Sequence, residues 1–367
     1  MAKKDLHKKP FPDETITKLE IFEAYLQEWL PVFIHNPYID KVNVCDFFAG
    51  AGEDPVGVPG SPLRIMSIIE RYRDDILAKE LKIKVIFNEY IKWKFKNLCN
   101  CVKDREKKLG LENNVEIEYH NEDFANLFPK VATEIKDKAN LIFLDQSGVK
   151  QITQQVFEAL ETFTSTDFMF FIASSFFNRF GKLKAFKNYF PDLDLAKIKG
   201  SPQAYIHRII VEYYKEKLPQ SSKTKLYPFT IKKDQNIYGL IFGTKNVLGA
   251  EKFLKIAWDK NKINGEANFD IDDDIDKQQP TLFPELQGKT KIEKFNDDVR
   301  KVIAGSKMIS NKGLYDYALD NGFLPSHVSE IVRNLKKEGL IQYKGHTKIS
   351  YDKCYKNPEE IIFKAIK

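Results

Sequence analysis

The chain has 367 residues, of which 43% are apolar, so it is long enough for more than one domain and apolar enough for a sizeable core. Its 58 Lys and Arg against 52 Asp and Glu give a net charge of +6, a mild excess that permits a nucleic-acid partner without requiring one. No apolar run reaches the ~20 residues of a membrane-spanning helix, and the first residues lack the apolar core of a signal peptide. We therefore expect a cytoplasmic protein that does not enter a membrane.

Cysteine and acidic residues give no sign of a metal site. Only Cys99 and Cys101 are close in sequence, and a single C-x-C without a second pair is a poor zinc site. The five aspartates between residues 270 and 276 lack the central Gly and the terminal Glu of a calcium loop. We expect reduced thiols, a solvated acidic connector and no bound metal.

The first two thirds of the chain alternate strand-like and helix-like segments. Residues 14–34 repeat apolar residues at helical spacing and predict a leading helix. Five short runs that are apolar on both faces predict buried parallel strands, at 42–48, 83–90, 115–120, 140–145 and 167–174. Helical segments separate them at 61–79, 91–109, 123–138 and 151–162. This alternation predicts a doubly wound α/β domain.

The pattern changes after residue 200. A helix is expected at 204–217, followed by two strand-like runs, 225–233 and 236–245, separated only by Asp234 and Gln235. Such a short connection predicts an antiparallel hairpin. A parallel sheet with an antiparallel terminal hairpin is the Rossmann-like arrangement of S-adenosylmethionine methyltransferases rather than that of all-parallel dehydrogenases. Methyl transfer is therefore favoured over hydride transfer.

A glycine-rich loop is the main candidate for cofactor binding. The first predicted strand ends at Asp46, and four glycines, among them Gly50 and Gly52, precede a helix that opens with Ser61-Pro62. Ser is a preferred N-cap and Pro suits the first helical position, so we expect Ser61 to cap this helix. A loop between a strand and a helix brings backbone close to a ligand at the helix N-terminus, so Gly50, Gly52 and Ser61 are candidate cofactor-binding residues.

Acidic side chains at three successive strand ends strengthen this interpretation. Asp46 can address the methionine end of S-adenosylmethionine, and Glu89 can accept both ribose hydroxyls. Asp123 and Phe124 suit the amino group and the ring face of adenine. The alternative for any one acid is a helix N-cap, and Asp123 could simply cap the third crossover helix.

The fourth strand ends in Leu144-Asp145-Gln146-Ser147-Gly148, where a methyl acceptor would be held. Asp145 is the candidate catalytic residue, since a carboxylate there can hold or deprotonate a nucleophile. The segment lacks the two prolines and the aromatic residue usual in amino-methyltransferases. It also lacks a cysteine nucleophile for cytosine C5 chemistry. The target atom therefore stays open.

The C-terminal part predicts a second module. We expect a methyltransferase-like domain over 1–263, an acidic linker or wrapping segment over 264–290, and a winged-helix domain over 291–367. The last has helical patterns at 292–304, 310–320 and 325–338, followed by two short strand runs around Lys344-Gly345-His346.

This winged helix is basic, with 15 Lys and Arg against 10 Asp and Glu. Its third helix and wing supply candidates for binding DNA or RNA. These are Ser326, His327, Arg333, Lys336, Lys337, Lys344 and Lys348. The alternative is a protein-docking module, in which case Tyr343, Tyr351 and the segment IIFKAIK are the interface candidates.

Four segments resemble the three-Cys-motif partner proteins (TcmP). They are FAGAG…GSPL at 48–63, LDQSG at 144–148, NGEANFDID at 264–272 with QPTLF at 279–283, and the winged helix. The resemblance implies a methyltransferase-type domain with a tail module, associated with a partner that carries a three-cysteine motif like that of radical-S-adenosylmethionine enzymes. Family members tend to read Asp-Pro-Phe-Gly at the fourth strand, where this chain has Gln146 and Ser147 in place of Pro and Phe.

Two functions follow from these observations. The first is an S-adenosylmethionine-dependent methyltransferase acting on nucleic acid or on a substrate bound to it. The alternative is a non-catalytic, nucleotide-binding adaptor whose winged helix recruits a partner enzyme to DNA. The departure at Gln146-Ser147 is the reason to keep the second.

Overall fold

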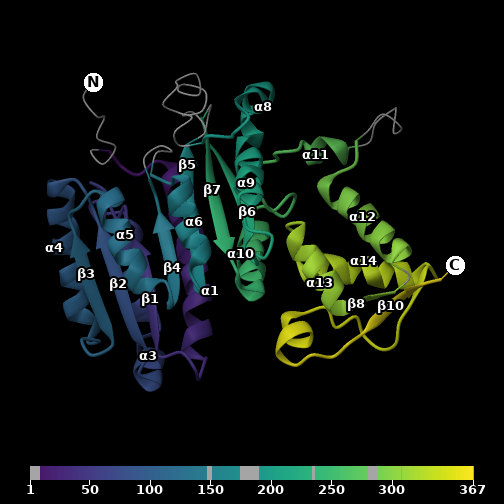
Figure 1. Cartoon of the computed structure of the whole chain (residues 1–367), viewed down its shortest axis with the longest axis horizontal. Coiled ribbons are helices and arrows are strands. Elements are labelled where there is room, and N and C mark those ends of the chain that lie inside the picture. Colours follow the sequence, from purple (N-terminus) through teal and green to yellow (C-terminus); the bar gives the residue numbers. More distant parts are fainter. Residues whose placement is uncertain are drawn as a thin grey trace. The chain divides into compact units, whose positions relative to one another are not determined.

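A computed structural model of the chain describes residues 9–146, 151–173, 190–233, 236–279, 288–306 and 308–366. They form two units, Met1–Asn246 and Val247–Lys367 (Figure 1). Contacts between residues divide the chain after Asn246, earlier than the boundaries predicted from the sequence at 263/264 and 290/291. Those two boundaries stay predictions. No helix among the described residues is both long and apolar enough to cross a bilayer.

The first unit is built on a seven-stranded sheet with the order β3-β2-β1-β4-β5-β7-β6. Strands β1 to β5 are parallel, whereas β7 runs antiparallel to both β5 and β6. The strands are β1 Lys41–Asp46, β2 Lys82–Asn88, β3 Val115–His120, β4 Ala139–Leu144, β5 Ser165–Ala173, β6 Lys225–Lys233 and β7 Asn236–Thr244. The methyltransferase-type sheet with a terminal antiparallel hairpin is thus confirmed. Residues 234–235 of the predicted turn lie outside the described residues.

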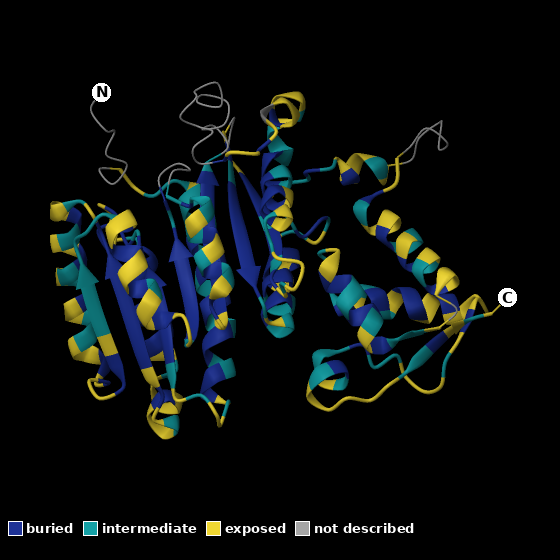
Figure 2. Cartoon of the chain, in the orientation of Figure 1, coloured by how far each residue is buried: buried dark blue, intermediate teal, exposed yellow. Residues whose placement is uncertain are grey.

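Helices cover both faces of this sheet: Figure 2 shows its inner strands in dark blue and the outer surfaces of the helices exposed, whereas the edge strand β3 is mostly of intermediate burial. The helices are α1 Asp13–Ile34, α2 Ser61–Arg71, α3 Arg73–Lys79, α4 Lys92–Leu109, α5 Phe124–Ile135, α6 Gln154–Thr162, α8 Leu195–Gly200 and α9 Ile206–Glu216, with a 3-10 turn at Gln203–Tyr205. Apolar residues of α5, α6 and α9 form one core with the sheet. On the other face α1 packs on α2, and Phe22 of α1 stacks on Phe143 of β4 at 4.3 Å.

The helix expected at 61–79 is two helices, because the backbone leaves helical geometry at Tyr72 (φ −98°, ψ 18°). The Tyr72 hydroxyl donates a hydrogen bond to the carbonyl of Gln27 in α1. This tertiary contact over 45 residues accompanies the break, and the local helical pattern gave no sign of it.

Strand β7 depends on a glycine at position 239. A Cβ atom at Gly239 would lie 1.7 Å from the ring of His207, which is fully buried on α9. The His207 ring is held by the carbonyl of Ile172 at 3.3 Å, and burial lowers its pKa to about 4. Only a residue without a side chain leaves room for α9 to pack this closely on the hairpin.

The second unit contains the expected three-helix module. Its helices are α10 Val247–Lys260, α11 Asp274–Lys277, α12 Lys291–Gly305, α13 Asn311–Asp320 and α14 Pro325–Lys337, with a π-helical turn at Asp352–Lys356. Its strands are β8 Met308–Ser310, β9 Ile341–Gln342 and β10 Ile362–Ala365. A capping box at Thr290 and Glu293 fixes the start of α12.

The expected second wing strand, just after Lys344-Gly345-His346, is wrong. The sheet order is β8-β10-β9, so the partner of β9 comes from the C-terminal segment, some 20 residues further along the chain. Phe363 of β10 is fully buried, which excludes its side chain as a free interface. Residues 343–349 carry no strand, and Gly345 and Lys348 both have positive φ, which interrupts an extended pairing.

The acidic segment before the winged helix is a bracing element in its described part rather than a solvated connector. Asn264 and Asp274 are fully buried. The Asp274 carboxylate accepts from the backbone N–H of Lys291 at 2.9 Å, at the start of α12. Gly265 (φ 63°) packs on Trp258 of α10, and a Cβ there would lie 2.4 Å from the indole. The segment therefore ties α10 to the winged helix.

Candidate functional site

The glycine loop between β1 and α2 is fixed by its own backbone. Gly50 and Gly52 have φ of 70° and 93°, which side chains disfavour. A Cβ at Gly52 would also lie 2.2 Å from the sulfur of Cys101, so α4 packs directly on the loop. The Asp54 carboxylate accepts from the N–H groups of Phe11, Val56 and Val58 at 2.8 to 3.0 Å. The loop is thereby held against α4 and the segment before α1.

Asp46 and Ser61 join the two ends of this loop. The Ser61 hydroxyl donates to Asp46 at 2.6 Å, and Asp46 also accepts from the N–H of Phe48 at 3.1 Å. The prediction that Ser61 is the N-cap of α2 is wrong: Gly60 holds that position, because the Ser61 hydroxyl is engaged by the buried carboxyl. Burial raises the pKa of Asp46 to about 7.

Glu89 connects the end of β2 to the glycine loop. One carboxylate oxygen accepts from the N–H of Gly50 at 3.1 Å and the other from the N–H of Ile91 at 2.7 Å. Asn121 donates to the carbonyls of Glu89 and Tyr90 and so fixes this turn to the end of β3. The structure therefore brings Glu89 and Gly50 together, as the sequence analysis requires of a shared ligand site.

Asp123 and Phe124, the two residues predicted to contact adenine, each have a structural role. Asp123 caps α5, its carboxylate accepting from the N–H of Ala125 at 2.9 Å. Phe124 is buried in an aromatic cluster, with ring centres of Phe48 and Phe128 at 5.0 and 5.2 Å. Its ring face is therefore used by the core. The N-cap alternative raised for Asp123 describes what its side chain does in this structure.

Asp145 at the end of β4 pairs with Lys18 of α1. Lys18 is only 5% exposed, and its ammonium lies 4.4 Å from the centre of the Phe171 ring. Lys18 was not among the residues predicted from the sequence. Its position could have indicated a role, because Lys18 lies on the buried face of α1 at helical spacing from Phe22 and Tyr25. A lysine on the apolar face of a helix needs a partner.

Gln146 is a structural residue. Its side chain is 2% exposed, donates to the carbonyl of Phe171 at 3.4 Å and accepts from the N–H of Gln151 at 2.8 Å. It therefore links β4 to β5 and to the start of the next segment. Ser147 and Gly148 lie outside the described residues.

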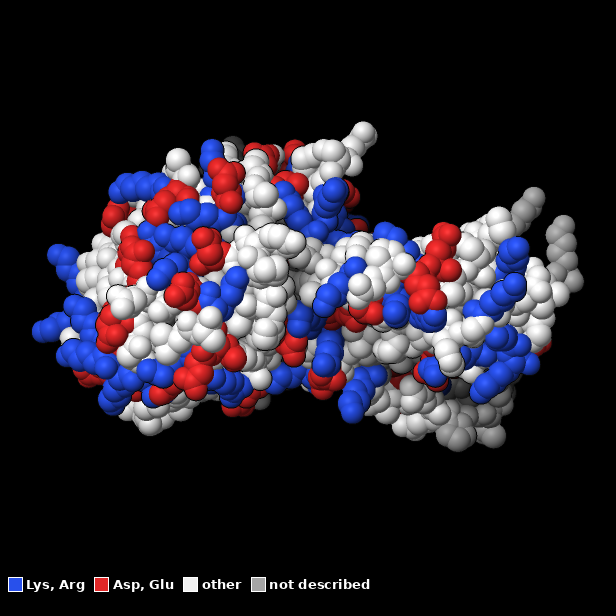
Figure 3. All heavy atoms as spheres, turned by 90° about the horizontal axis from the view of Figure 1, so that it is seen from below, with Lys and Arg blue, Asp and Glu red and all other residues white. Residues whose placement is uncertain are grey.

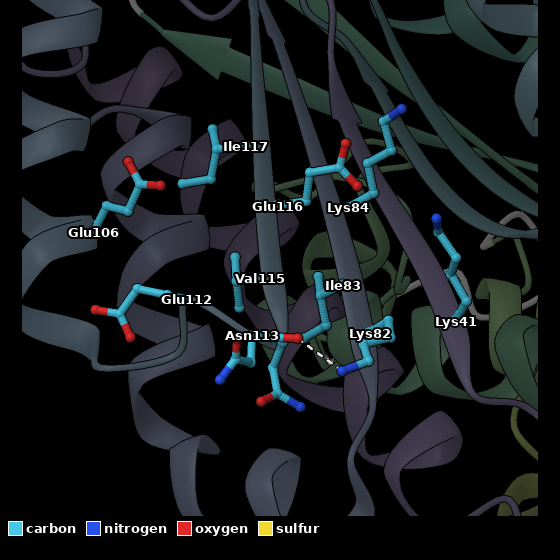
Figure 4. Close-up of a pocket in the computed structure, with 11 residues that line it drawn as sticks. Lys41, Lys82, Ile83, Lys84, Glu106, Glu112, Asn113, Val115, Glu116 and Ile117 are labelled. Atoms are coloured by element: carbon cyan, nitrogen blue, oxygen red, sulfur yellow. Dashed lines mark hydrogen bonds between the residues drawn. The ribbon is translucent and has the colours of Figure 1, made fainter.

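A separate depression of about 490 Å³ lies at the opposite, amino end of the strands (Figure 4). It is lined by both signs of charge, and Lys82 donates to the carbonyl of Asn113 at 2.7 Å. Lys84 is paired with Glu118 and Glu134. Lys82 and Lys84 therefore have partners within the protein, and the residues that line the depression do not include Asp46, Glu89, Asp123 or Asp145.

The predicted nucleic-acid residues divide by exposure. Ser326, Arg333, Lys336, Lys337 and Lys344 are exposed. His327 instead accepts from the N–H of Leu324 and packs edge-on against Trp258 at 4.5 Å, and burial lowers its pKa.

Two further lysines of that set have partners within the unit. Lys336 donates to the carbonyl of Tyr343 and lies 4.1 Å from the centre of its ring. Lys348 pairs with Glu359. Over the face drawn in Figure 3, Lys and Arg alternate with Asp and Glu on both units.

Residues 270–347 match a family model described as a GMT-like wHTH domain. The match includes α12, α13, α14 and β9 and ends before β10, and it covers less than half of the chain. The second unit thus contains a winged helix-turn-helix domain. No curated protein matches the chain.

Solved methyltransferases resemble the chain distantly. The DszA carbon methyltransferase aligns with a TM-score of 0.34 and 10% identity over 61% of this chain and 54% of that one. The methyltransferase domain of bacterial CtHen1-C gives 0.32 and 10% over 63% and 97%, and the 16S rRNA methylase ArmA gives 0.26 and 11% over 63% and 85%. The chain spans about half the length of DszA. At these TM-scores the fold assignment rests on the strand order and register described above.

Proposed function

We propose that the chain is an S-adenosylmethionine-dependent methyltransferase acting on nucleic acid or on a substrate bound to it. The observation that carries the proposal is the tether between Glu89 and Gly50, which links the acidic end of β2 to the glycine loop. It occurs in a sheet of methyltransferase order. The winged helix-turn-helix domain supports a nucleic-acid substrate.

The donors and acceptors present fit S-adenosylmethionine at the loop and the ribose. Both oxygens of Glu89 accept backbone N–H groups, and a carboxylate is also an acceptor to which ribose hydroxyls can donate. Gly50 and Gly52 adopt positive φ, which lets the backbone of the loop turn toward the N-terminus of α2. Phe124 does not fit as an exposed stacking surface because it is buried.

Three of the strand-end acids, Glu89, Asp46 and Asp145, then have defined roles. The bound cofactor supplies a sulfonium-linked methyl group to a nucleophile. Glu89 binds the ribose, and Asp46 holds the loop and α2 together through Ser61. Asp145, fixed by Lys18, accepts a hydrogen bond from the nucleophile and orients it.

Isothermal titration calorimetry with S-adenosylmethionine and S-adenosylhomocysteine tests the proposal directly. We expect saturable binding of both. No heat of binding to either at millimolar concentration would reject a methyltransferase and any role that requires the cofactor.

A second candidate, a non-catalytic adaptor, is favoured by the Lys18–Asp145 pair. An acid already paired with a buried ammonium, next to a structural Gln146, leaves no free base at the end of β4. Cofactor binding without methyl transfer to DNA, RNA or protein substrates would support the adaptor. Loss of turnover in Asp145→Ala with cofactor affinity retained would reject it.

We also propose that this function is exercised with a partner protein that carries a three-cysteine motif. The support is the sequence resemblance alone. Co-purification of the two proteins, repeated with the winged helix removed from one sample, tests which unit makes the contact.

A further inference from the structure

We propose that residues Tyr90 to Lys96, which lead into α4 and form its first turn, are a binding surface for single-stranded nucleic acid, separate from the winged helix. The inference rests on the proposed function in its choice of a nucleic-acid partner. It adds a surface on the first unit, beside the candidate cofactor site, because Tyr90 directly follows Glu89.

Exposed aromatic rings mark this surface. Tyr90 is 61% exposed and Trp93 is 43% exposed. The other two tryptophans, Trp29 and Trp258, are each 3% exposed. The buried Lys94 lies 5.7 Å from the centre of the Trp93 ring, so the ring is supported by the protein while much of it faces solvent. An exposed, supported indole suits stacking on an unpaired base.

Lysines accompany the rings. Lys92 and Lys96 are both exposed, and among the described residues neither makes an ion pair. Along a helix, positions 92, 93 and 96 fall within an arc of about 100°, so the two lysines and the indole share one face. Ammonium groups beside an exposed ring are what a phosphate backbone with splayed bases requires.

The whole helix favours a polyanion. Helix α4 contains seven Lys and Arg against two acids, Asp104 and Glu106. The excess of positive charge on α4 therefore favours nucleic acid, a polyanion, over a protein surface of mixed charge. The exposed rings favour single strands over duplex, because only unpaired bases can stack on them.

Tryptophan fluorescence of the full chain tests the surface, in the Arg333→Ala/Lys337→Ala/Lys344→Ala background that weakens the winged helix. A mixed-sequence single strand should quench the emission, and the matched duplex should quench it much less. Trp93→Phe should abolish the quenching but keep the affinity measured by anisotropy of a labelled strand. Trp93→Ala should weaken that affinity roughly 5- to 150-fold, the range of one lost base stack.

A charge-matched comparison separates this surface from general attraction. Lys92→Ala/Lys96→Ala should lower the salt dependence by about 1.4 in log–log slope, since each phosphate contact to a single strand contributes about 0.7. Lys107→Ala/Lys108→Ala removes the same charge at the other end of α4 and should have a clearly smaller effect. Equal effects of the two pairs, or equal quenching by duplex, would overturn the proposal.

The outcomes also separate this inference from the proposed function. Cofactor binding without any quenching would remove the α4 surface and leave the methyltransferase proposal intact. Quenching and salt dependence as expected, with no cofactor binding, would keep the surface and reject the methyltransferase.

Discussion

At the scale of single residues, Glu89 is the most direct test of the site. Glu89→Ala removes both the tether to Gly50 and the proposed ribose acceptor. We expect S-adenosylmethionine binding to weaken by roughly 1–3 kcal/mol, the cost of losing charge-assisted hydrogen bonds in a buried site. Calorimetry measures this loss. Glu116→Ala, an exposed acid at the amino end of β3, is the control and should bind as the wild type does.

The raised pKa of Asp46 predicts that the free energy of unfolding depends on pH. Its pKa of about 7 in the folded chain, raised by burial, exceeds the ordinary value of 3.8. Between these values the folded state holds a proton that the unfolded state has released, so the free energy of unfolding falls as pH rises from about 4 to about 7. The upper limit of this fall is roughly 4 kcal/mol.

Urea denaturation at several pH values, comparing the wild type with Asp46→Asn, isolates that contribution. The asparagine has no titration, so the difference between the two proteins should change across the window. Asp167, with a pKa of about 6, and His207, with a pKa of about 4, titrate in both proteins and cancel. A difference that stays constant from pH 4 to pH 8 would contradict the assignment.

At the scale of elements, the packing of α9 on β7 depends on Gly239. Gly239→Ala places a methyl group inside the His207 ring and should destabilise the first unit by about 1–3 kcal/mol. Gly200→Ala, where nothing lies within 4 Å of the new Cβ, is the control. Thermal unfolding by circular dichroism measures both.

The close packing of Gly239 and His207 leads to a second prediction, about the combined variant. Because His207→Ala empties the space that the new methyl group needs, the double variant should lose less stability than the sum of the two single variants. Strict additivity would show that the His207 ring is not what excludes a side chain at 239.

The burial of residues in and next to β10 predicts which side chains of the C-terminal segment stabilise the winged helix. Phe363→Ala empties a fully buried position and should cost about 3–5 kcal/mol of the stability of the second unit. Ile366→Ala, at a side chain 47% exposed, should change stability by less than about 0.5 kcal/mol. If Phe363→Ala unfolds at the wild-type temperature, the segment is not part of the core.

Most elements were predictable because their signals are local. The five parallel strands were expected from apolar runs and the hairpin from two runs joined by two residues, and both are present. The wing strand was placed wrongly because β9 is two residues long and its partner β10 is remote in sequence. A short run carries too little pattern to identify its partner.

The site was predictable only in part for a similar reason. Acids at strand ends follow from topology, so Asp46 and Glu89 were found. The partner of Asp145 is 127 residues away on α1, and no spacing rule connects them. Whether an aromatic such as Phe124 faces a ligand or the core depends on its packed neighbours, which sequence does not give.

At the scale of the whole molecule, duplex DNA binding by the winged helix should be separable from cofactor binding by the first unit. Arg333→Ala/Lys337→Ala/Lys344→Ala removes three exposed cations of the winged helix, and the log–log salt slope for duplex DNA should fall by about 2.7. Cofactor affinity should not change. Fluorescence anisotropy at several salt concentrations gives the slope.

A matched variant uses the two paired lysines. Lys336→Ala/Lys348→Ala removes cations that already contact Tyr343 and Glu359, so its effect on the slope should be smaller per residue. Salt-independent, weak association of the wild type with duplex DNA would instead assign the winged helix to protein contacts.

The central position of β10 has a consequence for how the protein is made. Ser310, the last residue of β8, pairs with Ile362 of β10. More than 50 further residues must therefore be synthesised before β8 can form its sheet pairing. The winged-helix sheet therefore cannot close until its last strand has left the ribosome, whereas the strands of the first unit are complete much earlier. A stop codon before residue 362 would release a chain whose first unit is complete, whereas the second unit would expose apolar core residues to chaperones and proteases.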